Sequence, residues 1–302
     1  MKAIRMLGYG GVDQLHYEDV TTPTAGAGEV LVKLAATSVN PIDWKIRRGD
    51  TKGWMALQFP YIPGRDVAGE VVAIGSGVSD FKPGQPVMAL GSHSYAEFVV
   101  VAHEALTRIP EGLDPLQAGA LPLVTTTGAQ LMERANPRRG QTVLVTGALG
   151  GVGRSAVFIA LGRGARVIAG VRGRQKVQAQ QLGAQQVIAL DSDAEIATLP
   201  QLDAIADTID GEAVGKLLSK LKRGGVLASV LGKPKAAEGL DIRVEPISAQ
   251  PDPDLLHEMA EAVRRGALAI PVAMRFKLSE AAAAQKMAEE GKADGKIVLT
   301  PE

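Results

Sequence analysis

The stretch that decides the fold is Gln141–Arg154, which reads QTVLVTGALGGVGR. Its first half contains the apolar run Val143–Val145, which is typical of a buried strand. Four glycines follow within seven residues, and beyond them small and apolar side chains recur at helical spacing. A strand, a glycine-rich turn and a helix in this order predict the phosphate-binding turn of a dinucleotide site.

Each part of this turn has a physical reason. A glycine adopts backbone angles that are closed to other residues, and its bare main chain can approach a pyrophosphate. The following helix start offers free N–H groups and a partial positive charge. A ligand-free glycine turn in an α/β fold is the alternative interpretation. The residues predicted to contact the cofactor here are Gly147, Ala148, Leu149, Gly150, Gly151, Val152 and Gly153.

The charges that follow the second predicted strand indicate which dinucleotide is bound. An NAD site places Asp or Glu about 20 residues beyond the glycines, at the end of that strand, for the ribose 2′-OH. Here the strand that begins at Arg166 ends without an acid and runs into Arg172, Arg174 and Lys176. Arginine and lysine bind phosphate, so the turn predicts NADPH through its 2′-phosphate. A solvated basic turn is the alternative.

Three segments with different patterns organise the chain. Residues 1–115 hold short apolar or alternating runs between Pro- and Gly-rich turns, which predict an antiparallel barrel or sandwich. Residues 116–249 alternate strands with helices, which predicts a parallel sheet with right-handed crossovers. A helix over Gly215–Leu221 is expected to stop at Gly224 and Gly225. Residues 250–302 hold two helices and a closing strand, expected to return to the first domain.

The composition excludes several classes of function. Among the 302 residues, 33 basic side chains balance 33 acidic ones, which argues against wholesale nucleic-acid binding. No apolar run reaches the roughly 18 residues of a membrane span, and the start of the chain lacks a signal-peptide core. The absence of cysteine excludes disulfides and Cys-ligated metals, so we expect a cytoplasmic protein without metal. The four histidines show no metal-ligand spacing, and no nucleophile-elbow motif is present.

Seven ordered segments together resemble the zinc-free, zeta-crystallin-like quinone oxidoreductase group of the medium-chain dehydrogenase/reductase superfamily. The segments are Ser38–Asp43, Pro63–Val71, Gly75–Gly84, Tyr95–Phe98, Leu121–Thr127, the glycine turn with its A-x-G-x-x-G form, and Gly295–Leu299. This resemblance covers essentially the whole chain.

The resemblance implies an α/β fold with a GroES-like β-barrel domain at residues 1–115, which carries the substrate site. It further implies a Rossmann-type, doubly wound parallel sheet at 116–249, and a C-terminal segment at 250–302 that returns to the first domain. NADPH is the implied cofactor, with Leu231, Gly232 and Lys296 as further cofactor-binding candidates. A homodimer is also implied, which we expect to form through the sheet edge near Asp241–Ala249.

One departure from the zinc enzymes of the superfamily bears on the chemistry. This chain has Asn40 where those enzymes carry a cysteine ligand, and Arg65 where they carry a histidine. Catalytic zinc needs three protein ligands, so no metal site is expected. Without a metal to acidify an alcohol, the hydride acceptor is expected to be electron-poor already, such as a quinone or an α,β-unsaturated carbonyl.

Four residues are predicted to act at the reaction centre. The resemblance puts Asn40 at the substrate end, where its amide would donate to a carbonyl oxygen, and Thr127 in the cofactor cleft. Lys45 would stabilise an anion if it faces the cleft, but would do nothing chemical if it pairs with Asp43 or Asp50. Tyr61 is a candidate proton donor. The structural alternatives are a turn-capping Asn40, a helix-start Thr127 and a packed Tyr61 with a solvated hydroxyl.

The leading functional prediction is a zinc-independent, NADPH-dependent oxidoreductase that reduces quinones or enones. An enoyl-thioester reductase, which would need a channel for a phosphopantetheine arm, is the nearest rival. A non-enzymatic NADPH-binding protein, of the crystallin or sensor kind, is the alternative from a different class. The sequence does not choose among the quinone, enone and enoyl-thioester substrates.

Overall fold

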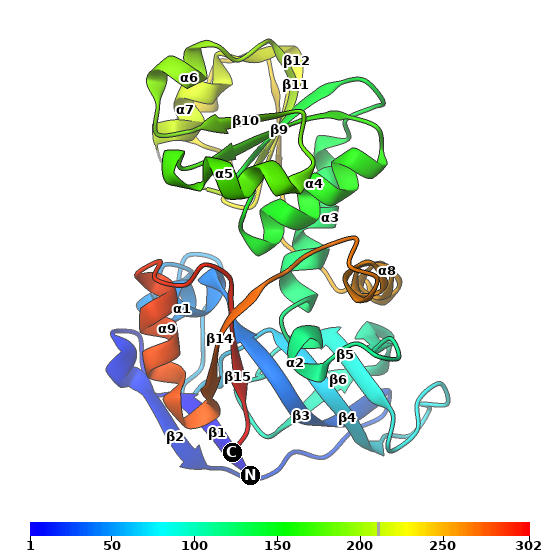
Figure 1. Ribbon diagram of the computed structural model, residues 1–302. Helices are drawn as coiled ribbons and strands as arrows, with labels where there is room; N and C mark the ends of the chain where they lie inside the picture. The colour runs from blue at the N-terminus through cyan, green and yellow to red at the C-terminus, as the bar shows by residue number, and fades with distance from the viewer. Residues whose placement is uncertain (210–211) are drawn as a thin grey trace. The chain divides into compact units, whose positions relative to one another are not determined.

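The computed structural model describes residues 1–209 and 212–302. The chain divides into two compact units, which are described separately (Figure 1). We call residues Met1–Leu123 with Pro251–Glu302 the barrel unit, and residues Val124–Gln250 the Rossmann unit. The predicted combination of a largely antiparallel β unit with a doubly wound parallel sheet is confirmed.

The Rossmann unit is built on a six-stranded parallel sheet with the strand order β10-β9-β8-β11-β12-β13. If these six strands are numbered 1 to 6 in chain order, starting from β8, their order across the sheet is 3-2-1-4-5-6. The direction of winding therefore reverses between β8 and β11. The strands are β8 (Thr142–Thr146), β9 (Arg166–Val171), β10 (Gln186–Ala189), β11 (Leu202–Asp207), β12 (Leu221–Ser229) and β13 (Arg243–Pro246). The helices are α3 (Pro122–Ala135), α4 (Gly151–Gly162), α5 (Lys176–Ala179), α6 (Asp193–Ala197) and α7 (Glu212–Leu218), with 3₁₀ turns at Gly173–Gln175, Gln180–Leu182 and Lys235–Ala237.

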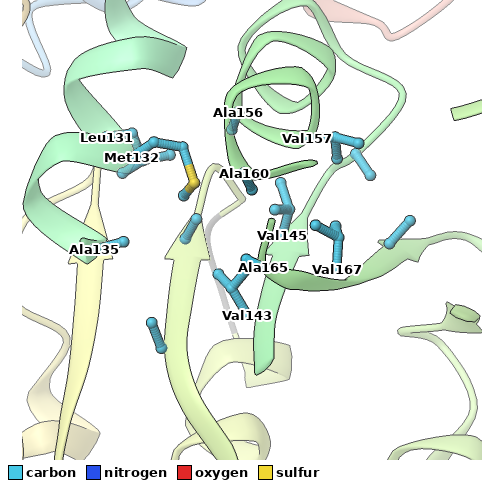
Figure 2. Close-up of a cluster of buried hydrophobic side chains, with 14 of the residues drawn as sticks. Leu131, Met132, Ala135, Val143, Val145, Ala156, Val157, Ala160, Ala165 and Val167 are labelled. Atoms are coloured by element: carbon cyan, nitrogen blue, oxygen red, sulfur yellow. The ribbon is translucent and has the colours of Figure 1, made fainter. Parts of the chain in front are cut away.

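Both faces of this sheet are buried, which explains the continuous apolar character of its strands. On one face, Val143 and Val145 of β8 pack with α3 and α4 through Met132 and Ala156 (Figure 2). On the other face, Leu144 of the same strand belongs to a second cluster with residues of α6 and α7. Successive side chains of β8 therefore enter two separate cores, as the two-residue repeat of a strand requires.

One boundary in this unit was predicted wrongly. The helix ends at Leu218 instead of continuing to Leu221, and Gly224 and Gly225 lie inside strand β12. Leu202 pairs with Leu221 whereas Ala204 pairs with Val226, so the intervening residues of β12 bulge out of the ladder. Gly224 has a φ of +69°, which favours glycine. The glycine pair therefore forms a bulge within a strand and does not end a helix.

The barrel unit contains a seven-stranded sheet with the order β14-β15-β3-β4-β5-β7, in which β6 also pairs with β3. A hairpin of β1 and β2 stands beside it. The strands are β1 (Lys2–Met6), β2 (Leu15–Asp19), β3 (Glu29–Val39), β4 (Asp66–Ile74), β5 (Pro86–Leu90), β6 (Phe98–Ala102), β7 (Leu106–Arg108), β14 (Val272–Lys277) and β15 (Lys296–Thr300). The helices are α1 (Pro41–Arg48), α2 (Pro115–Ala118), α8 (Pro253–Arg264) and α9 (Ala281–Glu289), with 3₁₀ turns at Val12–Gln14, His103–Ala105 and Leu278–Glu280.

The two ends of the chain meet in the barrel unit (Figure 1). Strand β15 pairs antiparallel with β3, with Val298 opposite Ser38, and β14 extends the sheet parallel to β15. Helix α9 contributes Ala281 and Ala284 to a core that also contains Ile4 of β1. The last 52 residues, 251–302, therefore complete the sheet that begins near the N-terminus. Over the described residues, no helix combines the length and the hydropathy that a membrane crossing requires.

Candidate functional site

Two glycines shape the turn between β8 and α4. Gly147 has a φ of +58°, and a Cβ placed there would lie 2.5 Å from Thr208 Oγ1. A Cβ on Gly153 would lie 2.2 Å from the carbonyl oxygen of Gly147, so only glycine lets the helix pack this closely on the turn. These two glycines are fixed by steric contact within the fold itself.

The start of α4 is free to bind an anion. Gly150 is the N-cap residue and has no side chain, and the first turn of the helix contains no acidic residue. Arg154 donates from Nε to the carbonyl oxygen of Leu149 at 2.9 Å and so fastens the turn to the helix; burial lowers the pKa of its guanidinium. The turn lies after β8, where the strand order reverses, which is the usual ligand crevice of such sheets. The residues present therefore fit a dinucleotide pyrophosphate.

A buried hydrogen-bond network, which the sequence did not reveal, ties the carboxyl ends of three adjacent strands together. The carboxylate of Asp207 on β11 accepts from Thr146 Oγ1 of β8 at 3.0 Å and from Ser229 Oγ of β12 at 2.8 Å. Ser229 Oγ in turn accepts from the N–H of Leu231 at 3.1 Å. Gly232 follows with a φ of +88°. The network fixes the main chain of the predicted cofactor residues Leu231 and Gly232 at this edge of the sheet.

The turn after β9 carries the predicted cations, but it also carries acids from elsewhere in the chain. Arg172 and Arg174 are exposed, and within the described parts of the chain no ion pair involves either side chain. Lys176 instead binds both carboxylate oxygens of Glu195 at 2.8 Å. The N–H of Gly173 donates to Asp191 Oδ1 at 2.8 Å. Asp191 and Glu195 follow β10, the strand next to β9, so spatial proximity brings in acids that sequence distance hides.

The barrel unit buries a charged cluster around Asn40, the N-cap residue of α1. The side-chain amide of Asn40 donates to Asp66 Oδ2 at 2.7 Å and to the carbonyl oxygen of Ser38 at 3.3 Å, and its Oδ1 accepts from the ammonium of Lys296. Both amide hydrogens therefore have protein acceptors, and the residue is fully buried. The donation to a substrate carbonyl that the resemblance implies for Asn40 stays a prediction.

Asp66 and Lys296 form the charged part of this cluster. Asp66 Oδ1 accepts from the N–H of Leu123 at 2.7 Å, and its Oδ2 accepts from Ser38 Oγ and lies 3.7 Å from Lys296 Nζ. The ammonium also donates to the carbonyl oxygen of Val39 at 3.2 Å. Burial lowers the pKa of Lys296, while the nearby carboxylates favour its charged form. The predicted cofactor residue Lys296 thus bonds to protein atoms in the barrel unit.

Asp43 supplies a second carboxyl group to the same buried region. Its Oδ2 accepts from the N–H of Asn40 at 2.8 Å, as an N3 residue does in a capping box, and from Tyr95 Oη at 3.0 Å. Its other oxygen, Oδ1, has no hydrogen-bond partner within the described structure. Burial, followed by the charge of Asp66, raises the pKa of Asp43 to about 7. Burial also raises the pKa of Tyr95 well above its usual value.

Lys45 and Tyr61 are less enclosed. Lys45 is half-buried, and neither predicted ion pair is formed, because Asp43 bonds inward to Asn40 and Asp50 pairs with Arg48. Tyr61 exchanges two main-chain hydrogen bonds with Met6, and its ring packs edge-on against His93 at a centroid distance of 5.1 Å. Burial raises the pKa of the Tyr61 hydroxyl, and the charge of Asp43 adds to this shift.

Thr127 is buried on helix α3, in the Rossmann unit. The next residue, Gly128, explains how closely this helix approaches α4, since a Cβ there would lie 2.5 Å from the Cβ of Ser155. Elsewhere, across residues 1–209 and 212–302, no three His, Cys, Asp or Glu side chains gather in a metal-binding group. The roles predicted for Thr127, Lys45 and Tyr61 stay predictions.

Comparisons with known proteins agree with this architecture. Residues 26–111 match the alcohol dehydrogenase GroES-like domain, and residues 182–299 match the zinc-binding dehydrogenase family. A chloroplast envelope quinone oxidoreductase homolog from Arabidopsis thaliana is 31% identical, over all of this chain and 98% of the relative. An NADPH-dependent alkenal/one oxidoreductase, also from Arabidopsis thaliana, is 34% identical over 77% of this chain and 63% of the relative.

Among solved structures, the quinone oxidoreductase from Coxiella burnetii superposes with a TM-score of 0.90 at 30% identity, over 100% of this chain and 99% of the other. The agreement extends over both units. The chain therefore belongs to the quinone oxidoreductase group of the medium-chain dehydrogenase/reductase superfamily, and it is an oxidoreductase.

Proposed function

We propose that this chain is a metal-independent, NADPH-dependent reductase that transfers a hydride to a quinone or to an α,β-unsaturated carbonyl. The observation that carries the proposal is the bare turn Gly147–Gly153 at the switch point of the parallel sheet. Bound NADPH would supply the hydride. The protein would then contribute binding, orientation and electrostatics.

Two observations support NADPH as the cofactor. Strand β9 itself ends without an acid, and Arg172 and Arg174 present exposed guanidinium groups beside that end. A guanidinium group matches the geometry of a phosphate with two parallel N–H donors. The NADPH-dependent relative from Arabidopsis thaliana supports the same choice. Asp191 is the feature that opposes it, since a carboxylate at this edge of the sheet suits a ribose hydroxyl.

The polar groups of the barrel unit support a substrate that is an electron-poor hydride acceptor. They do not support the zinc-assisted oxidation of an alcohol. Asn40 is committed to Asp66 and Lys296, and Arg65 donates from Nε to the carbonyl oxygen of Gly91 at 2.8 Å. These are the two positions at which a zinc enzyme would present cysteine and histidine ligands. A quinone or an enone accepts a hydride without metal assistance. The names of the quinone oxidoreductase relatives agree with this substrate class.

We propose that Tyr61 donates the proton to the reduced product and that Lys45 stabilises the negative charge that develops on the substrate. A tyrosine hydroxyl, whose ordinary pKa is about 10, is protonated at neutral pH, as a proton donor must be, and burial raises the pKa of Tyr61 further. Lys45 has no ion pair within the described structure, so its ammonium is free to stabilise an enolate or a hydroquinone anion. Reduction of a quinone can take its protons from water, so Tyr61→Phe should reduce the rate with enones more than the rate with quinones.

The decisive experiment follows NADPH absorbance with four acceptors: a quinone, an enone, an enoyl-thioester and an aldehyde. Turnover of the quinone or the enone, with no gain from added zinc and no loss with a chelator, is the expected result. Preferential turnover of the enoyl-thioester would move the assignment to an enoyl-thioester reductase. Tight NADPH binding without turnover of any acceptor would favour a binding protein.

We also propose that the protein forms a homodimer and that it is located in the cytoplasm. Strand β13 forms one edge of the Rossmann sheet, and among the described residues it pairs with β12 on one side only. An unpaired edge of this kind is a template for a second chain. Light scattering of the purified protein tests the dimer, since a monomeric mass at micromolar concentration would contradict it. Fractionation of cells that produce the chain tests its location.

A further inference from the structure

The ion pair of Lys176 and Glu195 lies at the end of β9, where the ribose of a bound dinucleotide is expected. The ammonium of Lys176 binds both carboxylate oxygens of Glu195 at 2.8 Å, and both side chains are about one-third exposed, at 38% and 34%. Lys176 is one of the three cations predicted to bind the 2′-phosphate of NADPH. In this structure, however, two of its three N–H donors already have a fixed acceptor.

The carboxylate of Glu195 is held in place independently of Lys176. Its Oε2 also accepts from the main-chain N–H of Ala189 at 2.9 Å, and its own N–H donates to the N-cap Ser192 Oγ at 3.3 Å. The ion pair with Lys176 lowers the pKa of Glu195, so the group is ionised at neutral pH. Glu195 is therefore an immobile negative charge beside a predicted phosphate ligand.

We infer that Glu195 is a specificity-determining residue for the dinucleotide: its carboxylate, which lies against Lys176, repels a 2′-phosphate bound there and so moderates the preference for NADPH over NADH. The inference rests on the proposed function, because it concerns the cofactor of that same site. It goes further by assigning the preference to an acid on helix α6, outside the glycine turn and the basic turn.

The direction of the effect follows from charge. A 2′-phosphate that reached Lys176 would place close to two negative charges within about 6 Å of the Glu195 carboxylate, and repulsion at this range in water corresponds to about three- to tenfold in affinity. The pair itself offers little resistance, since an exposed ion pair is weak and can exchange partners. A neutral ribose hydroxyl, as in NADH, would not experience this repulsion.

Arg172 and Arg174 play a different part. Within the described residues no acid pairs with either guanidinium, so both are available to a phosphate without breaking an existing contact. The arginines would therefore provide most of the preference for NADPH over NADH. Lys176 and Glu195 would then set how large that preference is.

The experiment measures binding of two fragments that lack the nicotinamide, 2′,5′-ADP and 5′-AMP, to the intact wild-type protein and to Glu195→Gln by isothermal titration calorimetry. Glutamine keeps an oxygen acceptor for the Ala189 N–H but removes the charge. We expect Glu195→Gln to bind 2′,5′-ADP about three- to tenfold more tightly at low salt, and 5′-AMP within about twofold of wild type. The tightening should shrink as salt is added.

The matched control is Asp193→Asn, which removes the same charge from the same short helix. Asp193 pairs with Lys216 at 2.8 Å, so its loss should leave the ratio of the two affinities unchanged. In a Lys176→Met background, Glu195→Gln should have a smaller effect than in wild type. An equal effect in both backgrounds would overturn the role given to the pair.

Unchanged or weaker binding of 2′,5′-ADP by Glu195→Gln would also overturn the inference. Weaker binding would mean that Glu195 positions Lys176 for the phosphate. These results are distinct from failure of the proposed function, in which wild-type protein binds neither NADPH nor NADH when followed by nicotinamide fluorescence. That failure would remove the inference together with the function. Thermal unfolding of each variant confirms that it is folded under the binding conditions.

Discussion

Lys296 donates a hydrogen bond to Oδ1 of Asn40 across 256 positions of sequence, inside a region where both side chains are almost fully buried. The contact joins the last strand of the chain to the start of α1. It fixes the orientation of the Asn40 amide, because a lysine ammonium can only donate and so identifies the acceptor end of that amide. The residue that stands at a metal-ligand position in related zinc enzymes is thus held by a buried cation.

The first prediction concerns the loss of the buried ammonium group of Lys296. Lys296→Met should leave the carboxyl groups of Asp43 and Asp66 buried without compensation, at a cost of about 3–5 kcal/mol in the free energy of unfolding. Urea unfolding at pH 7.5 measures this. Lys292→Met removes an exposed lysine that pairs with Glu290, and it should cost less than about 1 kcal/mol. Equal effects of the two substitutions would contradict a charged role for Lys296.

The second prediction concerns pH. The pKa of Asp43 is about 7 in the folded chain, against 3.8 when the group is free in solvent, so the folded chain binds an extra proton between these values. The free energy of unfolding should therefore fall as pH rises from about 4 to 7, by an upper limit of about 4 kcal/mol, and should level off above pH 7. The lowered pKa of Lys296 acts with the opposite sign, because there the unfolded chain binds the extra proton.

Asp43→Asn isolates this effect, because the amide oxygen can still accept from the Asn40 N–H and from Tyr95. Comparison of urea unfolding at pH 5, 6, 7 and 8 should show a decline in wild type and a flatter profile in the variant. Parallel profiles for the two proteins would show that Asp43 does not hold the proton.

The third prediction concerns the glycine turn. Gly153→Ala would place a Cβ 2.2 Å from the Gly147 carbonyl oxygen, so the turn must move away from the helix start. We expect NADPH to bind at least about tenfold more weakly, which corresponds to a loss of about 1.4 kcal/mol. Nicotinamide fluorescence measures the dissociation constant.

Gly162→Ala is the matched control for this variant. Gly162 ends the same helix, and a Cβ there would meet nothing within 4 Å. Alanine is the better helix former by up to about 1 kcal/mol, so this variant should be at least as stable as wild type and should bind NADPH normally. Normal NADPH binding by Gly153→Ala would refute the steric role of the glycine.

The fourth prediction concerns the basic turn after β9. The double variant Arg172→Ala/Lys176→Ala should raise the dissociation constant of NADPH by about tenfold or more, because it removes charge-assisted hydrogen bonds to the 2′-phosphate. NADH should bind within about twofold of wild type. Arg166→Ala, at the opposite end of the same strand, is the control for loss of surface charge. Unchanged NADPH affinity in the double variant would exclude this turn as the phosphate site.

The sequence predicts local features of this protein well and distant contacts poorly. The apolar run Val143–Val145 was predicted to be a buried strand and lies within β8, since a short apolar run directly before a glycine-rich turn leaves little choice. The pair of Glu195 with Lys176 was not predicted, because Glu195 follows the next strand and only the sheet brings the two together. The same reason hid the cluster of Asp43, Asp66 and Lys296, which three separate segments assemble. Gly224 and Gly225 were misassigned because a bulge and a helix stop use the same residue type.

The pairing of β15 with β3 has a consequence for the order in which the protein forms during synthesis. The Rossmann unit is continuous in the chain, so all of its strands exist before the ribosome has added the last 52 residues. The barrel unit must wait for the final strand, which delivers Lys296 to Asp43 and Asp66. Nascent chains should therefore acquire a protease-resistant Rossmann unit first, while residues 1–123 stay incomplete until β15 has been synthesised.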